Sequence, residues 1–117
     1  YQQRYSECLS LLDSLEGALG GHTLIDEIIY KKGAVYFEMR EWEKAASAYQ
    51  QIVDAYSFDL LGDDAYYRLA KLYDEQLNDP DKAFELYGDM LTKYPGSSYT
   101  VQARKRYRQM RGDTPGT

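Results

Sequence analysis

Two stretches of this chain align with each other at a period of 37 to 38 residues. Residues 29–36 recur as 66–73, and residues 43–49 recur as 81–87. Each copy has a small residue with an aromatic three positions later, a short polar break, and then an alanine with an aromatic four positions later. At helical spacing, small residues let two helices approach closely while aromatics one turn away fill the space beside them. The repeat therefore predicts an all-α fold, an α-solenoid of stacked antiparallel helix hairpins.

Six helices are expected, and turns make up almost all of the remainder. The turn inside the second hairpin is one residue longer than its counterpart in the first, which accounts for the two values of the period. In that turn, Pro80 suits the first turn of a helix and Asp79 is the candidate N-cap. The expected helices span residues 2–18, 24–39, 42–56, 62–77, 80–93 and 98–111.

Single helices flank the two complete hairpins. The first helix matches the second half of a repeat, and the last helix matches a first half. Three arginines of the last helix fall where the earlier copies carry packing residues: Arg104, Arg108 and Arg111. We therefore expect the array to end in a polar capping helix. The domain should comprise residues 1–111, with a half repeat at 2–18, repeats at 24–56 and 62–94, the cap at 98–111, and a flexible tail at 112–117.

The charge of the chain argues against some classes of partner. With 19 acidic and 14 basic side chains, the net charge is −5, which is unlike a general nucleic-acid-binding protein. The charge is unevenly placed, because residues 1–103 carry a net −9 and residues 104–117 a net +4. Cations in the last turns of a final helix suit the helix dipole. An anionic partner for this basic end is the alternative. No apolar run approaches the ~20 residues that span a bilayer.

No group of residues suggests catalysis, a metal or a cofactor. His22 is the single histidine, and it stands in a turn without an acid-base or ligand partner. Cys8 is the single cysteine and aligns with alanines of the later copies, which favours a small buried thiol over a nucleophile. The acidic pairs at 26–27 and 63–64 fall in helix first turns, where carboxylates favour the dipole. We therefore expect no enzyme, no cofactor and no metal site.

These residues resemble tetratricopeptide repeats over about residues 5–111. The first unit carries Gly33, Tyr36, Ala45 and Tyr49 in the family pattern. The second unit fits it better, with Leu69, Ala70, Tyr73, Ala83, Tyr87 and Pro95. Lys32 and Ser57 depart from the pattern, since a leucine and a proline are usual there. The resemblance implies a right-handed superhelix that binds proteins or peptides on its concave face.

The loop leading to the last helix, residues 94–99, resembles the version common in bacterial cell-envelope repeat proteins. This detail favours the periplasm or cell envelope over the cytoplasm.

Most of the 13 tyrosines occupy packing positions, but Tyr30 and Tyr67 are each followed by a base. The resemblance places them on first helices facing the concave groove, where apolar contact would give affinity and bases would select acidic groups. The alternative is that these are ordinary amphipathic residues whose stems cover the core. The family's clamp for a C-terminal carboxylate is not reproduced. The expected partner-binding residues are Tyr30, Lys31, Phe37, Tyr67, Arg68, Lys71, Lys105 and Arg106.

We interpret the chain as a non-catalytic protein-protein interaction module. Because it begins inside a helical pattern without a methionine, we expect it to be the C-terminal part of a longer repeat protein. The alternative is a scaffold that spaces or dimerises larger parts while the groove stays empty. On that alternative, the first helix would self-associate through an apolar side, including Leu9, Leu12 and Leu15, that lacks a hairpin partner.

Overall fold

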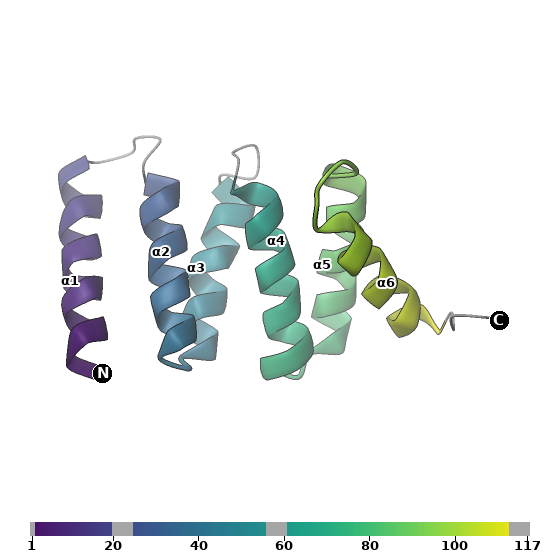
Figure 1. Ribbon diagram of the computed structural model, residues 1–117, viewed down its shortest axis with the longest axis horizontal. Coiled ribbons are helices and arrows are strands. Elements are labelled where there is room, and N and C mark those ends of the chain that lie inside the picture. Colours follow the sequence, from purple (N-terminus) through teal and green to yellow (C-terminus); the bar gives the residue numbers. More distant parts are fainter. Residues whose placement is uncertain (1, 20–24, 56–60, 113–117) are drawn as a thin grey trace.

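The computed structural model describes residues 2–19, 25–55 and 61–112, and every regular element within these ranges is helical. Figure 1 shows the helices standing side by side, in sequence order, along one long axis. The elements are α1 (Gln2–Leu19), α2 (Ile25–Glu38), α3 (Trp42–Ala55), α4 (Gly62–Lys71), η1 (Leu72–Gln76), α5 (Pro80–Lys93) and α6 (Thr100–Arg111). The predicted six-helix repeat array is confirmed, and each predicted boundary lies within two residues of an observed one.

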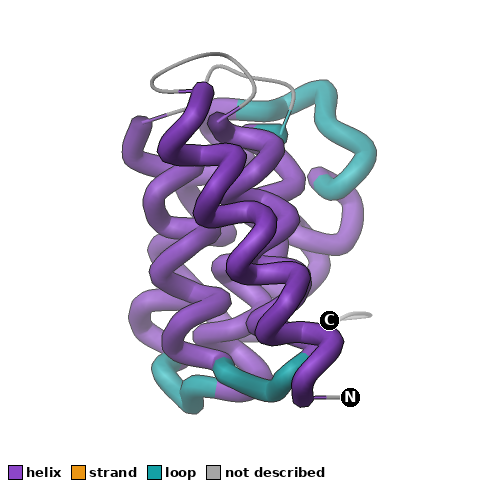
Figure 2. The backbone as a smooth tube through the Cα atoms, turned by 90° about the vertical axis from the view of Figure 1, so that its left-hand side faces the viewer, coloured by secondary structure: helices purple, strands orange, loops and turns teal. Residues whose placement is uncertain are grey.

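Consecutive helices pack against each other from α1 to α6, so the core runs as a continuous layer through the array. Figure 2, which looks along the array from the α1 end, shows the helices one behind another. Within the described residues, none of these helices combines the length and apolar character needed to cross a membrane.

Small residues make the close helix contacts that the repeat pattern predicts. Ala45 of α3 and Ala83 of α5 are both fully buried. A Cβ atom added to Gly33 of α2 would lie 3.0 Å from two ring atoms of Tyr49. The α2 backbone therefore approaches the Tyr49 ring so closely that a side chain at position 33 would press against it.

The turn of the first hairpin closes with the hydrogen bonds of a Schellman motif. Arg40 has a positive φ of 61°. Its backbone N–H donates to the Phe37 carbonyl at 3.0 Å, and the next N–H, from Glu41, donates to the Tyr36 carbonyl at 2.9 Å. The left-handed conformation of a residue with a Cβ atom costs about 1–2 kcal/mol, and these two bonds offset that cost.

The second hairpin absorbs its extra residue in a π-helical turn. We expected one uninterrupted helix over 62–77, but the structure changes from α to π geometry at η1. The Leu77 N–H donates to the Leu72 carbonyl, five residues back, at 2.8 Å. The Asp79 N–H then donates at 2.8 Å to the carbonyl of Tyr73, the counterpart of Tyr36. Equivalent carbonyls, those of Tyr36 and Tyr73, thus close the two turns, and the second turn encloses one more residue.

The N-terminus of α5 follows directly from this turn. The Asp79 side chain accepts a hydrogen bond from the Lys82 N–H at 3.2 Å, and Pro80 occupies the first helical position. The predicted N-cap and proline position are therefore confirmed.

The α1 helix packs on α2, and one of the three leucines that we expect on an unpartnered side of α1 lies in the core instead. Leu12 is buried, which corrects its placement on an unpartnered side. Among the α1 leucines whose side chains the structure describes, Leu11 and Leu15 are exposed, at 61% and 41%. Lys32 of α2, the residue standing where the family has leucine, pairs with Asp13 at 2.6 Å and with Glu16 at 3.0 Å. A charged contact to α1 therefore replaces the usual apolar one.

The α6 helix is held by its Ala103 side, and its predicted cationic residues lie away from the core. Ala103 is fully buried, and Tyr107 stacks on Phe84 of α5 with ring centroids 4.5 Å apart. Arg104, Lys105 and Arg108 are exposed. These three cations lie on the exposed side of α6, and the role of α6 as a polar cap stays a prediction.

Candidate functional site

Three tyrosines, Tyr30, Tyr67 and Tyr99, lie on or next to the first helices of successive repeats. We call the surface formed by these tyrosines and the side chains bonded to them the tyrosine face. The rings of Tyr67 and Tyr99 stack with centroids 5.0 Å apart. The Arg68 guanidinium lies 5.6 Å from the Tyr30 ring centroid, and the Lys71 ammonium lies 5.6 Å from that of Tyr67. Cation-π and stacking contacts thus connect the face from α2 to the start of α6.

Asp64 is the centre of the tyrosine face. Its carboxylate accepts hydrogen bonds from the Tyr30 hydroxyl at 2.9 Å and the Tyr99 hydroxyl at 2.7 Å. It also pairs with the Nε atom of Arg68, one turn along α4, at 2.6 Å. One side chain therefore joins three successive repeat units.

The pKa shifts of the donors agree with this arrangement. Burial raises the pKa of Tyr30, and the hydrogen bond to Asp64 raises it further. The hydrogen bond to Asp64 is the main cause that raises the pKa of Tyr99. Burial lowers the pKa of Arg68, but the bond and charge of Asp64 more than offset it, so the pKa is raised. Both tyrosines therefore remain neutral donors, and Arg68 remains a cation, throughout the physiological pH range.

Asp74 of η1 forms a second internal cluster. Arg106 of α6 binds its carboxylate with two nitrogens, at 2.7 Å through Nε and 2.8 Å through Nη2. The Tyr87 hydroxyl donates to the same carboxylate at 3.3 Å. Burial, and then the negative charge of Asp74, raise the pKa of Tyr87. This two-nitrogen pairing fixes α6 against the preceding repeat.

A small cavity of about 80 Å³ opens beside the tyrosine face, between α2, α3, α4 and η1. Three of the predicted site residues meet at it, namely Phe37, Arg68 and Lys71. Phe37 is 39% exposed and rests edge-on against the Trp42 ring. The cavity is also lined by Tyr49, Leu72, Glu75 and Gln76.

Tyr49 is one of the lining residues, and its buried hydroxyl makes no hydrogen bond. Tyr49 as a whole is only 1% exposed. Burial raises the pKa of this hydroxyl, and Arg68 offsets part of the increase. Because a guanidinium group only donates hydrogen bonds, Arg68 gives the hydroxyl proton no acceptor. A buried donor without an acceptor costs about 1–3 kcal/mol.

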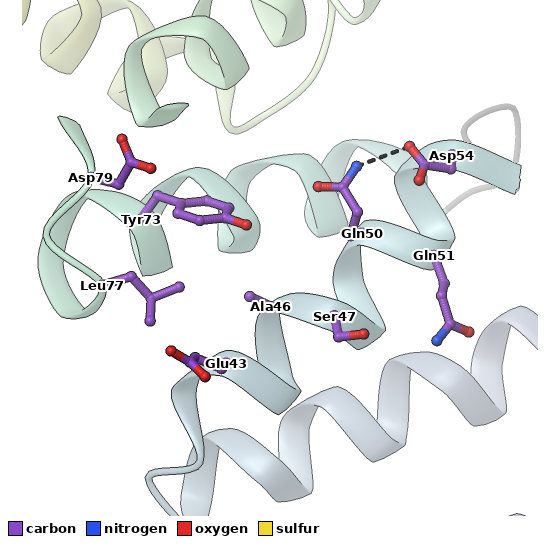
Figure 3. A pocket seen from close by; sticks show the side chains of 9 residues that line it. All are labelled: Glu43, Ala46, Ser47, Gln50, Gln51, Asp54, Tyr73, Leu77 and Asp79. Atoms are coloured by element: carbon purple, nitrogen blue, oxygen red, sulfur yellow. Dashed lines mark hydrogen bonds between the residues drawn. The ribbon is translucent and has the colours of Figure 1, made fainter. Parts of the chain in front are cut away.

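A larger hollow of about 530 Å³ lies between α3 and the η1 end of the next hairpin, shown in Figure 3. Three carboxylates line it, those of Glu43, Asp54 and Asp79, together with the apolar Leu77. Gln50 donates to Asp54 at 2.9 Å, the dashed line in Figure 3. No sequence pattern predicts this hollow, whose acidic lining contrasts with the cations of the tyrosine face.

The tetratricopeptide repeat profile matches residues 27–58 and 64–97, one match to each hairpin and together more than half of the chain. The chain belongs to the tetratricopeptide repeat family. No curated protein gives a significant match. Tetratricopeptide repeats generally mediate protein-protein interaction, and their fold is not catalytic. Among the described residues, no group of three His, Cys, Asp or Glu side chains is placed to hold a metal ion.

The predicted site residues fall into three groups on this tetratricopeptide repeat array. Tyr30, Tyr67 and Arg106 are engaged in internal bonds or stacks. Phe37, Arg68 and Lys71 meet at the small cavity, although Arg68 is also bonded to Asp64. Lys31 and Lys105 are exposed and line neither the small cavity nor the acidic hollow.

Sequence reasoning missed Asp64, Tyr99 and the hydroxyl of Tyr49. A pattern was available for Asp64, which is 34 residues after Tyr30 and 35 before Tyr99, close to one repeat period in each direction. We interpreted the pair at 63–64 as dipole capping alone. The unpartnered state of Tyr49 has no local sequence pattern, because it depends on which residue the neighbouring helix presents.

Proposed function

We propose that this tetratricopeptide repeat domain is a non-catalytic module that binds a segment of a partner protein along the tyrosine face. The observation that supports this most is the cavity that Phe37, Arg68 and Lys71 line together with Tyr49, whose buried hydroxyl makes no hydrogen bond. Elsewhere on the face, internal bonds already occupy many polar groups. Recognition is therefore concentrated at one preorganised position, which lowers the entropy cost of binding.

The side chains at this position are of the kinds that dominate protein interfaces. Aromatic residues and arginine supply most of the binding energy in many complexes. Phe37 offers partly exposed apolar area, and Arg68 and Lys71 offer positive charge. Exposed cations at the margin, Lys31 and Lys105, would mainly affect the rate and salt dependence of association.

The alternative function is a scaffold that assembles through its N-terminal helix. The supporting observation is the exposure of Leu11 and Leu15 on α1. Exposed apolar side chains on a helix favour contact with another helix. Sedimentation of the isolated domain over a range of concentrations tests this proposal, and a strict monomer would remove its main support.

Photo-crosslinking in the native cell tests the binding proposal directly. We would place a benzophenone amino acid at Phe37 in the full-length protein, with the matched control at Ser47, an exposed residue of α3 that lies outside the small cavity. We expect a discrete protein adduct from position 37 and none from position 47. Adducts from position 47 alone would place recognition on another face. Alanine at Tyr30 or Tyr67 is a poorer test, since it also removes internal contacts.

A further inference from the structure

The two repeats contain equivalent sites that differ at one side chain. Tyr49 and Tyr87 occupy the same position in their repeats, since both follow a fully buried alanine by four residues. Arg68 and Arg106 are likewise equivalent, each three residues after a buried alanine. The third position, directly after the equivalent residues Tyr36 and Tyr73, holds Phe37 in the first repeat and Asp74 in the second.

In the second repeat this site is complete. The Asp74 carboxylate accepts a hydrogen bond from the Tyr87 hydroxyl at 3.3 Å and is bound by two nitrogens of Arg106, at 2.7 and 2.8 Å. The carboxylate side chain is only 7% exposed. The tyrosine donor, the arginine donors and the carboxylate acceptor therefore satisfy one another inside the protein.

In the first repeat the two donors are present, but Phe37 stands at the position equivalent to Asp74. Phe37 has no acceptor atom, and the buried Tyr49 hydroxyl has no partner. Arg68 pairs with Asp64 through Nε, and its side chain remains 46% exposed. A cavity of about 80 Å³ lies where these groups meet.

We propose that this cavity binds the carboxylate of an aspartate or glutamate side chain from the partner, in the role that Asp74 has in the second repeat. This inference rests on the proposed binding function and names the chemistry that the site selects. The Tyr49 hydroxyl donates one hydrogen bond to the incoming carboxylate, and the Arg68 guanidinium donates from its terminal nitrogens. Lys71 adds a second positive charge, and Glu75 is the single carboxylate among the lining residues.

A side chain is the better source than a chain terminus, because Phe37 and Trp42 extend apolar surface beside the cavity. A segment that continues past the cavity can place its neighbouring residues on that surface. A terminal carboxylate would use the cavity and leave one side of this surface uncovered.

Small blocked amino acids test the chemistry without knowledge of the partner. N-acetylglutamate α-amide carries only a side-chain carboxylate, N-acetylglutamine amide is its neutral match, and N-acetylalanine carries only a terminal carboxylate. We expect the glutamate compound to shift the NMR signals of the Tyr49 ring and the Arg68 Nε–H saturably, and Tyr49→Phe to abolish the effect. Equal shifts with the glutamine compound would overturn the charge requirement. Stronger shifts with N-acetylalanine would overturn the side-chain source.

A pair of substitutions tests the same inference within the protein. Phe37→Asp supplies the missing carboxylate internally, and Phe37→Asn is its neutral control. We expect the Asp variant to melt at a higher temperature than the Asn variant at pH 7 and to lose binding of the glutamate compound. A bound carboxylate has a depressed pKa, so this advantage should disappear as the pH falls through that pKa. An Asp variant no more stable than the Asn variant would overturn the inference. If these tests fail but position 37 still gives a protein adduct in the native cell, the proposed binding function remains and only the selection of a carboxylate is wrong.

Discussion

Substitution of Asp64 should weaken the whole array, because its carboxylate joins three repeat units. Asp64→Ala removes the acceptor of the Tyr30 and Tyr99 hydroxyls and the ion-pair partner of Arg68. A hydrogen bond to a charged group contributes about 1.5–3 kcal/mol. These three donors are only partly buried, and water can replace some of the lost bonding. We therefore expect about 1 kcal/mol for each bond and a total loss of about 3 kcal/mol.

Urea unfolding followed by circular dichroism measures this loss. For a domain of this size, about 3 kcal/mol corresponds to a fall in melting temperature of roughly 10 °C. Asp63→Asn is the matched control, because Asp63 is the neighbouring carboxylate and accepts one side-chain hydrogen bond, from Ser97 at 2.6 Å. It should cost about 1 kcal/mol or less.

A double-mutant cycle separates the contact with Tyr30 from general disruption. Tyr30→Phe in the Asp64→Ala background should cost clearly less than Tyr30→Phe in the wild type, with a coupling of about 0.5–1.5 kcal/mol. An Asp64→Ala variant within about 0.5 kcal/mol of the wild type would refute the argument that this carboxylate ties the repeats together.

Three further substitutions or conditions test the packing and the tyrosines. Leucine at Ala45 or Ala83, both fully buried, should overpack a hairpin and cost about 1–3 kcal/mol in urea unfolding, and unchanged stability of both variants would contradict the placement of the repeats. Gly33→Ala should destabilise the domain, because the new Cβ would lie 3.0 Å from the Tyr49 ring. Gly17→Ala on α1, whose Cβ would meet nothing within 4 Å, should stabilise it by about 0.5–1 kcal/mol. The reverse order of melting temperatures would contradict the close approach of Gly33 to Tyr49. Above about pH 10 the unfolded chain loses the Tyr30 proton that the folded state keeps, so the free energy of unfolding should fall by up to about 1.4 kcal/mol per pH unit for this residue. Tyr30→Phe should show a shallower fall with pH when urea unfolding is measured at alkaline pH. Identical slopes for the two proteins would rule out the raised pKa of Tyr30.

Much of the fold is predictable from the sequence because its determinants are local. Spacing of small and aromatic residues gives the helix positions, and Asp79 with Pro80 gives the start of α5. The π-helical turn is harder to predict, because the same sequence is compatible with an extra residue in the loop and with an extra residue in the helix. The structure shows that η1 contains the extra residue. The Tyr73 carbonyl therefore still accepts the hydrogen bond that closes the turn, as the Tyr36 carbonyl does in the first hairpin.

The candidate site is less predictable because its contacts are long-range. A ladder of tyrosines and bases was visible, yet the sequence did not show that Asp64 would engage Tyr30 and Arg68 internally. The prediction that Leu12 lies on an unpartnered side of α1 is also wrong, since Leu12 is buried. A helix with several leucines can pack in more than one orientation. Such choices depend on the neighbouring helix rather than on local spacing.

The central claim is that the buried Tyr49 hydroxyl has no acceptor in the free protein and donates to a carboxylate of the partner. The comparison of Tyr49→Phe with Tyr87→Phe tests this claim most directly. Both changes remove one hydroxyl from equivalent, almost fully buried rings. Tyr87→Phe should cost about 1–2 kcal/mol in urea unfolding, since it removes a bond to the Asp74 carboxylate. Tyr49→Phe should cost nothing, or stabilise by up to about 1 kcal/mol, because its hydroxyl is buried without a partner. Equal losses from the two variants would show that the Tyr49 hydroxyl is already satisfied in the free protein and would contradict the account.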